Sequence, residues 1–152
     1  MTRSLVKWLM ARRWLLLAAA LTVALGLASR ALLHGPPAKV IGVALYATLI
    51  YWLVRAAYPR PSHADASGPS SRPPTRALSF AIPASLALAI SWAVEFLQLT
   101  PISAKLSATH PVLRLIFGEV FSTTDLIWYA LGVAAGVLID FIIQHRISSP
   151  RT

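Results

Sequence analysis

The chain has 152 residues, of which 57% are hydrophobic and only 12% are charged. Soluble domains carry about 25% charged residues, so this composition indicates an integral membrane protein and excludes an ordinary soluble domain. Cysteine is absent, which excludes disulfides, a thiol nucleophile and Cys-based zinc or iron–sulfur sites. A net charge of +9 is typical of nucleic-acid binding in a soluble protein. In a membrane protein, loop cations set the topology instead, and we expect no nucleic-acid partner.

Four apolar runs predict four membrane-spanning helices in a single integral membrane domain. The predicted spans cover about residues 14–33, 40–58, 77–99 and 122–143. A basic segment precedes the first run, which also fits a signal peptide, but further apolar runs follow and no clear cleavage site leads into a soluble domain. Gly35, Pro36 and Pro37 separate the first two runs, because glycine and proline break helices.

Two segments between the runs differ from the spans. Residues 59–76 are rich in Pro and Ser and cannot bury enough apolar surface to fold, which predicts a flexible cytoplasmic loop without chemistry. The third run ends at Thr100, because a residue before proline avoids the helical region. Within residues 102–121, the stretch 110–118 has a proline near its start and a glycine at its end. It predicts a short re-entrant or interfacial helix between spans three and four.

The distribution of basic residues predicts the orientation. Ten of the 14 Lys and Arg residues lie in the N-terminal segment, in residues 55–76 or in the C-terminal tail. Lys and Arg are enriched in cytoplasmic loops. We therefore expect a multi-pass membrane protein with both termini in the cytoplasm and a lipid bilayer as its surroundings.

The polar residues of the apolar runs fall on helical stripes. At about 100° per residue, spacings of three and four place residues on one helix face. The stripes are Asp125, Tyr129, Gly132, Gly136 and Asp140 in the fourth run; Ala84, Ala87, Ser91, Glu95 and Gln98 in the third; and Ala19, Gly26 and Arg30 in the first. Small residues let helices approach closely, so Gly132 and Gly136 predict a close helix contact. The simplest bundle turns all three stripes inward.

Inward stripes predict a polar site near the outer face. Its candidate ligand-binding residues are Arg30, Glu95, Gln98, Arg114, Asp125 and Tyr129. A charge at bilayer depth costs about 2.5–3.5 kcal/mol, so Glu95 is expected to be neutral or paired with an arginine, here Arg30 or Arg114. Three interpretations stay open: an ion pair that only locks the bundle, a pocket for a polar headgroup or small anion, and catalysis with Glu95 or Asp125 as general base.

Neighbouring acids have simpler interpretations. Ser122 and Asp125 fit a capping box, in which the acid returns to the amide of the cap residue. Asp140 is expected to pair with Arg146, or with Arg12 or Arg13 at the same membrane face. The four histidines are scattered without ligand-like spacing, so the sequence predicts no metal and no cofactor.

The motifs around Glu95 and Asp125 resemble a known family. Glu95-Phe-Leu-Gln98, followed by Phe121-Ser-Thr-Thr-Asp125 and by Gly132-Val-Ala-Ala-Gly136, is similar to domain of unknown function 2809, a family of small bacterial membrane proteins. Gly26-Leu-Ala-Ser-Arg30 and Lys39-Val-Ile-Gly42 with Tyr46 fit the family as well. The resemblance covers most of the chain outside residues 59–76 and the tail. It implies a bacterial inner-membrane protein and supplies no reaction.

A more distant resemblance is to the VanZ family, which is linked to low-level teicoplanin resistance. It rests on the Glu-x-x-Gln pattern and on the Asp followed seven residues later by Gly. VanZ-like chains usually carry Asn four residues after the Asp, where this chain has Tyr129. The smaller family often carries an acid after the glycine at Gly42, where this chain has Val43. These departures put part of a shared site in doubt.

Together these features predict a cell-envelope membrane protein with an outward-facing polar pocket. The pocket would bind a polar or anionic component such as a lipid headgroup or cell-wall precursor, as an accessory to antibiotic resistance. Enzyme activity is the less favoured interpretation, in the form of a membrane-embedded enzyme on lipid-linked substrates. A structural subunit that packs into a homo- or hetero-oligomer through Gly132 and Gly136 is the remaining alternative.

Overall fold

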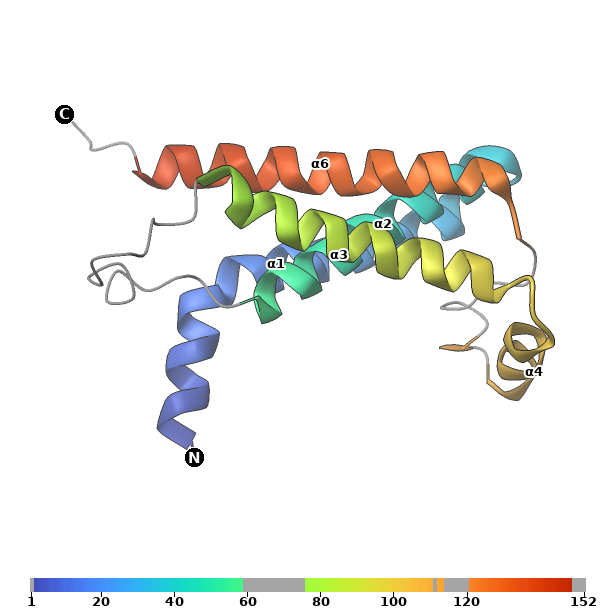
Figure 1. Cartoon of the computed structure of the whole chain (residues 1–152), viewed down its shortest axis with the longest axis horizontal. Helices are drawn as coiled ribbons and strands as arrows, with labels where there is room; N and C mark the ends of the chain where they lie inside the picture. Colours follow the sequence, from blue (N-terminus) through green and yellow to red (C-terminus); the bar gives the residue numbers. More distant parts are fainter. Residues whose placement is uncertain (1, 59–75, 111, 114–120, 149–152) are drawn as a thin grey trace.

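The computed structural model describes residues 2–58, 76–110, 112–113 and 121–148. These residues form helices and no strand, and four of the helices are long and apolar enough to cross a membrane (Figure 1). The predicted all-helical fold with four spans is therefore confirmed. The four long helices are α1 (Thr2–Leu32), α2 (Pro36–Ala57), α3 (Arg76–Leu97) and α6 (Thr123–Ser148).

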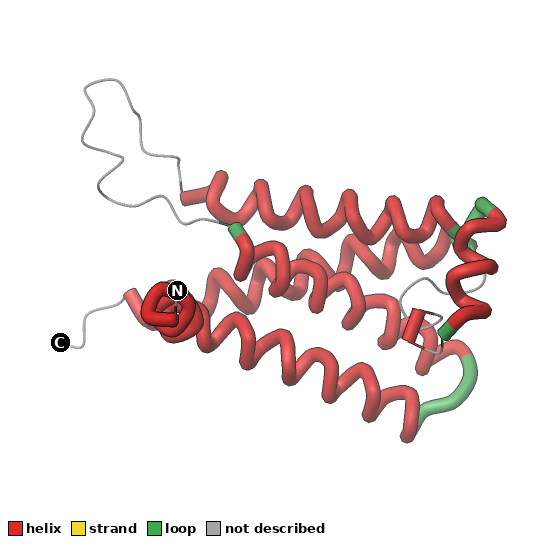
Figure 2. Tube along the Cα trace, turned by 90° about the horizontal axis from the view of Figure 1, so that it is seen from below, coloured by secondary structure: helices red, strands yellow, loops and turns green. Residues whose placement is uncertain are grey.

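Helix α2 is the centre of the bundle. It packs against α1, α3 and α6, while α3 also packs against α6 (Figures 1 and 2). Its inner face carries Ala47, Tyr51 and Trp52, which are almost completely buried. The Trp52 ring meets Trp14 of α1 edge-on, with the ring centroids 6.0 Å apart. Because α1 packs mainly against α2, it lies at one side of the bundle rather than at its centre.

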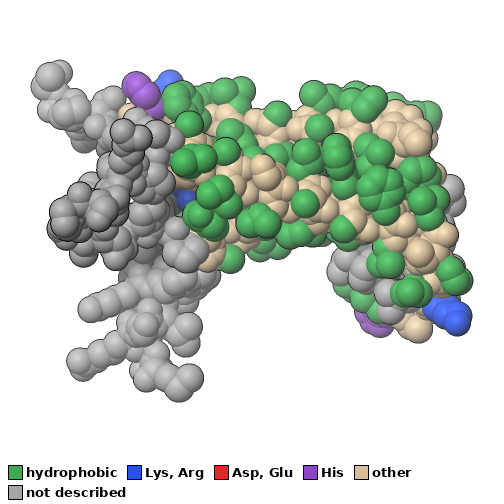
Figure 3. All heavy atoms as spheres, in the orientation of Figure 1, with side chains coloured by type: hydrophobic (Ala, Val, Ile, Leu, Met, Phe, Trp, Pro, Cys, Tyr) green, Lys and Arg blue, Asp and Glu red, His purple; other side chains and the backbone are tan. Residues whose placement is uncertain are grey.

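The outer surface of the bundle matches a bilayer. Large apolar side chains such as Leu17, Leu86 and Leu138 are exposed on α1, α3 and α6. Figure 3 shows hydrophobic side chains covering the visible face of the helices. In water such a surface would be unstable, whereas lipid tails solvate it.

Local sequence signals explain the turn between the first two helices. α1 ends at Leu32, and Gly35 adopts a positive φ of 71°, which residues with a Cβ rarely adopt. Pro36 and Pro37 then occupy the first positions of α2, where a missing N–H costs nothing. The predicted break at this point is confirmed.

The two glycines of the fourth run make the predicted close contact, and their partner is α2. A Cβ on Gly132 would lie 2.1 Å from the carbonyl oxygen of Ala44, and a Cβ on Gly136 would lie 2.8 Å from Cδ1 of Tyr51. The Thr48 hydroxyl donates a hydrogen bond of 2.8 Å to the Gly132 carbonyl. The backbone of α6 therefore touches the backbone of α2 at Gly132 and the Tyr51 side chain at Gly136.

The connection between α3 and α6 differs from the prediction in position. α3 ends at Leu97, earlier than the predicted residue 99, and α4 (Pro101–Thr109) follows it at the same end of the bundle (Figure 1). Most of the stretch 110–118, predicted to form a short helix, lies outside the described residues, so a re-entrant or interfacial helix there stays a prediction. The predicted loop at 59–76 likewise lies outside them, except for Arg76. We call the end of the bundle that carries α4 the α4 end. The opposite end, where α1 begins and α6 ends, is called the terminal end.

Candidate functional site: buried acids at the α4 end

Glu95 is the centre of the candidate site. It lies in the last turn of α3 and is completely buried. One carboxylate oxygen, Oε1, accepts a hydrogen bond of 2.6 Å from the backbone N–H of Ser122. The other, Oε2, accepts a bond of 2.7 Å from the Tyr129 hydroxyl. Glu95 therefore joins the end of α3 to the beginning of α6.

The position of Glu95 explains how a buried carboxylate is tolerated. Among the described residues no arginine pairs with it; its donors are a backbone amide and a hydroxyl. Ser122 directly precedes α6, where backbone N–H groups are unpaired and the helix dipole favours negative charge, and Tyr129 lies in the second turn of that helix. Hydrogen bonds to charged groups contribute about 1.5–3 kcal/mol each, which offsets the roughly 2.5–3.5 kcal/mol cost of the charge.

Asp125 lies in the first turn of the same helix, and its partner is Lys39. The Lys39 Nζ is 3.0 Å from Oδ2 of Asp125. The predicted capping box does not form as expected, because the Ser122 N–H donates to Glu95 and the Asp125 carboxylate turns to α2. The acid is 10% exposed and the lysine 55% exposed, so the pair presents its positive member outward.

Gln98 and Arg30, two further residues of the predicted site, do not bind the side chains of Glu95 or Asp125 in the described part of the chain. Gln98 lies just beyond the end of α3 rather than on its face, and its backbone N–H donates to the Glu95 carbonyl. Its side-chain Oε1 is buried and has no hydrogen-bond partner among the described residues. Arg30 is exposed on α1, and within the described part of the chain it pairs with neither acid. Arg114, the other expected counter-charge, lies outside the described residues.

A second buried cluster lies at the terminal end. The Oδ2 atom of Asp140 accepts hydrogen bonds of 2.9 Å from Arg55 Nε and 2.8 Å from the Tyr51 hydroxyl, and Gln144 donates to Oδ1. Asp140 and Arg55 are almost completely buried. The expectation that Asp140 pairs with Arg146, Arg12 or Arg13 is therefore wrong.

Arg12, one of those expected partners, has another role. It donates to the carbonyl oxygens of Ala56 and Tyr58, at the end of α2. A cation at that position is favourable, because the last carbonyls of a helix lack partners and carry the negative end of its dipole.

Sequence reasoning missed Lys39 and Arg55 as partners of the two acids. The sequence pointed to both residues, since each is a cation within or beside the second apolar run. An arginine within an apolar run is costly unless an acid faces it, so Arg55 by itself indicated a buried acidic partner.

A comparison with protein-family models finds a match that covers most of the chain. The model of the family described as protein of unknown function (DUF2809) matches residues 32–133, a region that contains Lys39, Glu95, Asp125 and Tyr129. No curated protein and no solved structure matches the chain.

Proposed function

The chain belongs to the DUF2809 family, and we propose that it is a protein of the bacterial inner membrane that binds a polar or anionic envelope component at its α4 end. The distribution of Lys and Arg supports the orientation: ten of the 14 lie, in the sequence, in the N-terminal segment, in residues 55–76 or in the C-terminal tail. With the terminal end in the cytoplasm, Glu95, Asp125 and Lys39 lie near the outer face of the membrane.

The observation that carries the proposal is the outward-facing cation of the Lys39–Asp125 pair. A buried carboxylate holds the lysine from below, while more than half of the lysine side chain stays exposed. A fixed ammonium at that depth attracts a phosphate or carboxylate of a headgroup. Glu95 keeps the start of α6, and with it Asp125, in a fixed place relative to α3.

Gln98 adds a requirement on the ligand. Its buried Oε1 has no partner among the described residues, and a buried acceptor left unpaired costs about 1–3 kcal/mol. A ligand with a hydroxyl or amine would supply the missing donor. The best match is therefore a component that carries both an anion and an O–H or N–H group, such as a lipid headgroup or a lipid-linked cell-wall precursor. The resemblance to VanZ suggests a role in resistance to cell-wall antibiotics.

The test is complementation of a deletion strain. We expect the deletion to change sensitivity to cell-wall antibiotics, teicoplanin included, and the wild-type gene to reverse the change. Lys39→Gln should fail to complement at a normal protein level, and Lys39→Arg, which keeps the charge, should complement. Lys105→Gln is the matched control, because Lys105 is another exposed lysine at the α4 end. Full complementation by Lys39→Gln would refute the proposal.

A purely structural role is the second candidate, and one observation favours it. Both oxygens of Glu95 already accept hydrogen bonds, from Ser122 just before α6 and from Tyr129 within it, so the residue connects two helices without any ligand. Under this alternative, Glu95→Gln and Lys39→Gln lose function only as far as the protein level and the unfolding midpoint in detergent fall. Under the binding proposal, Lys39→Gln loses function at an unchanged midpoint.

A further inference from the structure

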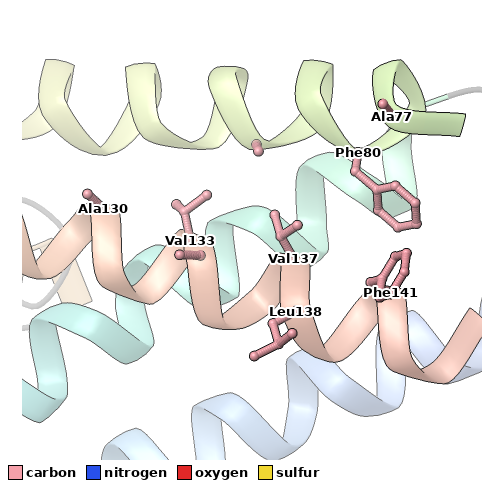
Figure 4. Close-up of a pocket in the computed structure, with 9 residues that line it drawn as sticks. Ala77, Phe80, Ala130, Val133, Val137, Leu138 and Phe141 are labelled. Atoms are coloured by element: carbon pink, nitrogen blue, oxygen red, sulfur yellow. The ribbon is translucent and has the colours of Figure 1, made fainter. Parts of the chain in front are cut away.

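We propose that a groove between α3 and α6 binds an acyl chain of an anionic phospholipid whose headgroup lies at the terminal end. The groove is separate from the acids of the α4 end and has a volume of about 620 Å³. Its lining includes Phe80 and Ala84 of α3 and Val133, Ala134, Leu138 and Phe141 of α6 (Figure 4). Its size falls within the roughly 300–1,000 Å³ of ordinary ligand pockets.

The lining explains why the occupant is hydrocarbon. Every lining residue is apolar, and all of them belong to the membrane-spanning parts of α3 and α6. The groove is hollow because alanines such as Ala84 on α3 and Ala134 on α6 leave room that larger side chains would fill. An elongated acyl chain fits a trough of this kind, whereas a headgroup inside it would find no hydrogen-bond partner among these residues.

The wall of the groove nearest the terminal end is fixed before any ligand binds. The rings of Phe80 and Phe141 meet edge to face, with their centroids 6.0 Å apart (Figure 4). The guanidinium of Arg55 lies 5.6 Å from the centroid of the Phe80 ring, and Asp140 holds Arg55 in place. The buried ion pair therefore positions the aromatic wall, and a preformed groove binds at a lower entropic cost.

The charge at this end favours an anionic lipid. His145 lies one turn beyond Phe141, and the centroids of their rings are 6.2 Å apart. The exposed Arg146 follows His145. Basic residues at the membrane surface attract anionic headgroups by about 1 kcal/mol each, or about fivefold in affinity. A second copy of this chain in the same orientation would instead bring like charges together. We therefore assign the groove to a phospholipid rather than to a second copy.

The test is photocrosslinking of the purified full chain in mixed micelles. The probe is phosphatidylglycerol with a diazirine in its acyl chain, and phosphatidylcholine with the same chain is the comparison. We expect phosphatidylglycerol to crosslink mainly to groove residues such as Val133 and Leu138. Ala134→Phe should fill the groove and abolish these crosslinks. Ala135→Phe is the matched control, since Ala135 is the adjacent exposed alanine and does not line the groove.

The headgroup is tested by charge. Arg146→Gln should lower the preference for phosphatidylglycerol over phosphatidylcholine about fivefold, and Lys105→Gln, at the other end, should not change it. Crosslinks spread evenly over the exposed residues of α6, or unchanged in Ala134→Phe, would overturn the proposal. So would a disulfide-linked dimer of Ala134→Cys, a variant with a single thiol because the chain has no cysteine. That outcome would assign the groove to a second copy.

Discussion

Replacing Gly132 by alanine tests the central contact of the bundle. The new Cβ would lie 2.1 Å from the Ala44 oxygen and 2.9 Å from its carbonyl carbon, and both atoms are backbone. No side-chain rotation relieves this clash, so α6 must move away from α2. The movement weakens the hydrogen bond from Thr48 to the Gly132 carbonyl. Overpacking costs about 1–3 kcal/mol and the hydrogen bond about 0.5–1.5 kcal/mol, while alanine in a helix returns roughly 0.5–1 kcal/mol. We expect a net loss of about 0.5–4 kcal/mol in the free energy of unfolding.

The assay is reversible unfolding in mixed micelles by added dodecyl sulfate, followed by circular dichroism. Gly26→Ala is the control, because a Cβ there meets no atom within 4 Å and should leave stability unchanged or slightly higher. Gly136→Ala should fall between the two. Its Cβ meets a side chain, Tyr51, which is held by a hydrogen bond to Asp140. Equal midpoints for Gly132→Ala and Gly26→Ala would refute the packing argument.

Two further predictions concern the buried ion pair and the orientation. Arg55→Leu leaves Asp140 as an uncompensated buried charge and should lower the free energy of unfolding by about 3–5 kcal/mol, whereas Arg55→Leu with Asp140→Leu should cost less than either single change. Additive losses in the same unfolding assay would show that the two side chains do not act as a pair. For the orientation, single cysteines at Lys105 and Arg146 are treated with a membrane-impermeant maleimide in intact cells. We expect labelling at residue 105 directly and at residue 146 only after permeabilisation, and the reverse order would contradict the proposed topology.

Periodicity and composition determined the inward faces of α3 and α6 without any tertiary information, whereas the stripe predicted for α1 does not face inward beyond Ala19, since Arg30 is exposed. Asp125, Tyr129, Gly132, Gly136 and Asp140 are all buried, as the single stripe in the sequence predicted. The same pattern worked for Ala87, Ser91 and Glu95 on α3. These predictions succeed because a helix has a fixed 100° rotation per residue, and because an acid in a membrane must avoid lipid. The break at Gly35 was equally local, since it depends on glycine and proline alone.

Only the tertiary structure decided which partner each buried group meets. A stripe shows that Glu95 faces inward, but not that the start of α6 lies opposite it and supplies a backbone amide in place of an arginine. Asp125 and Asp140 pair with Lys39 and Arg55 because α2, not α1, lies at the centre of the bundle. Arg30 is left exposed for the same reason. Helix order around an axis depends on how whole surfaces fit together, and the spacing of residues within one helix carries no record of it.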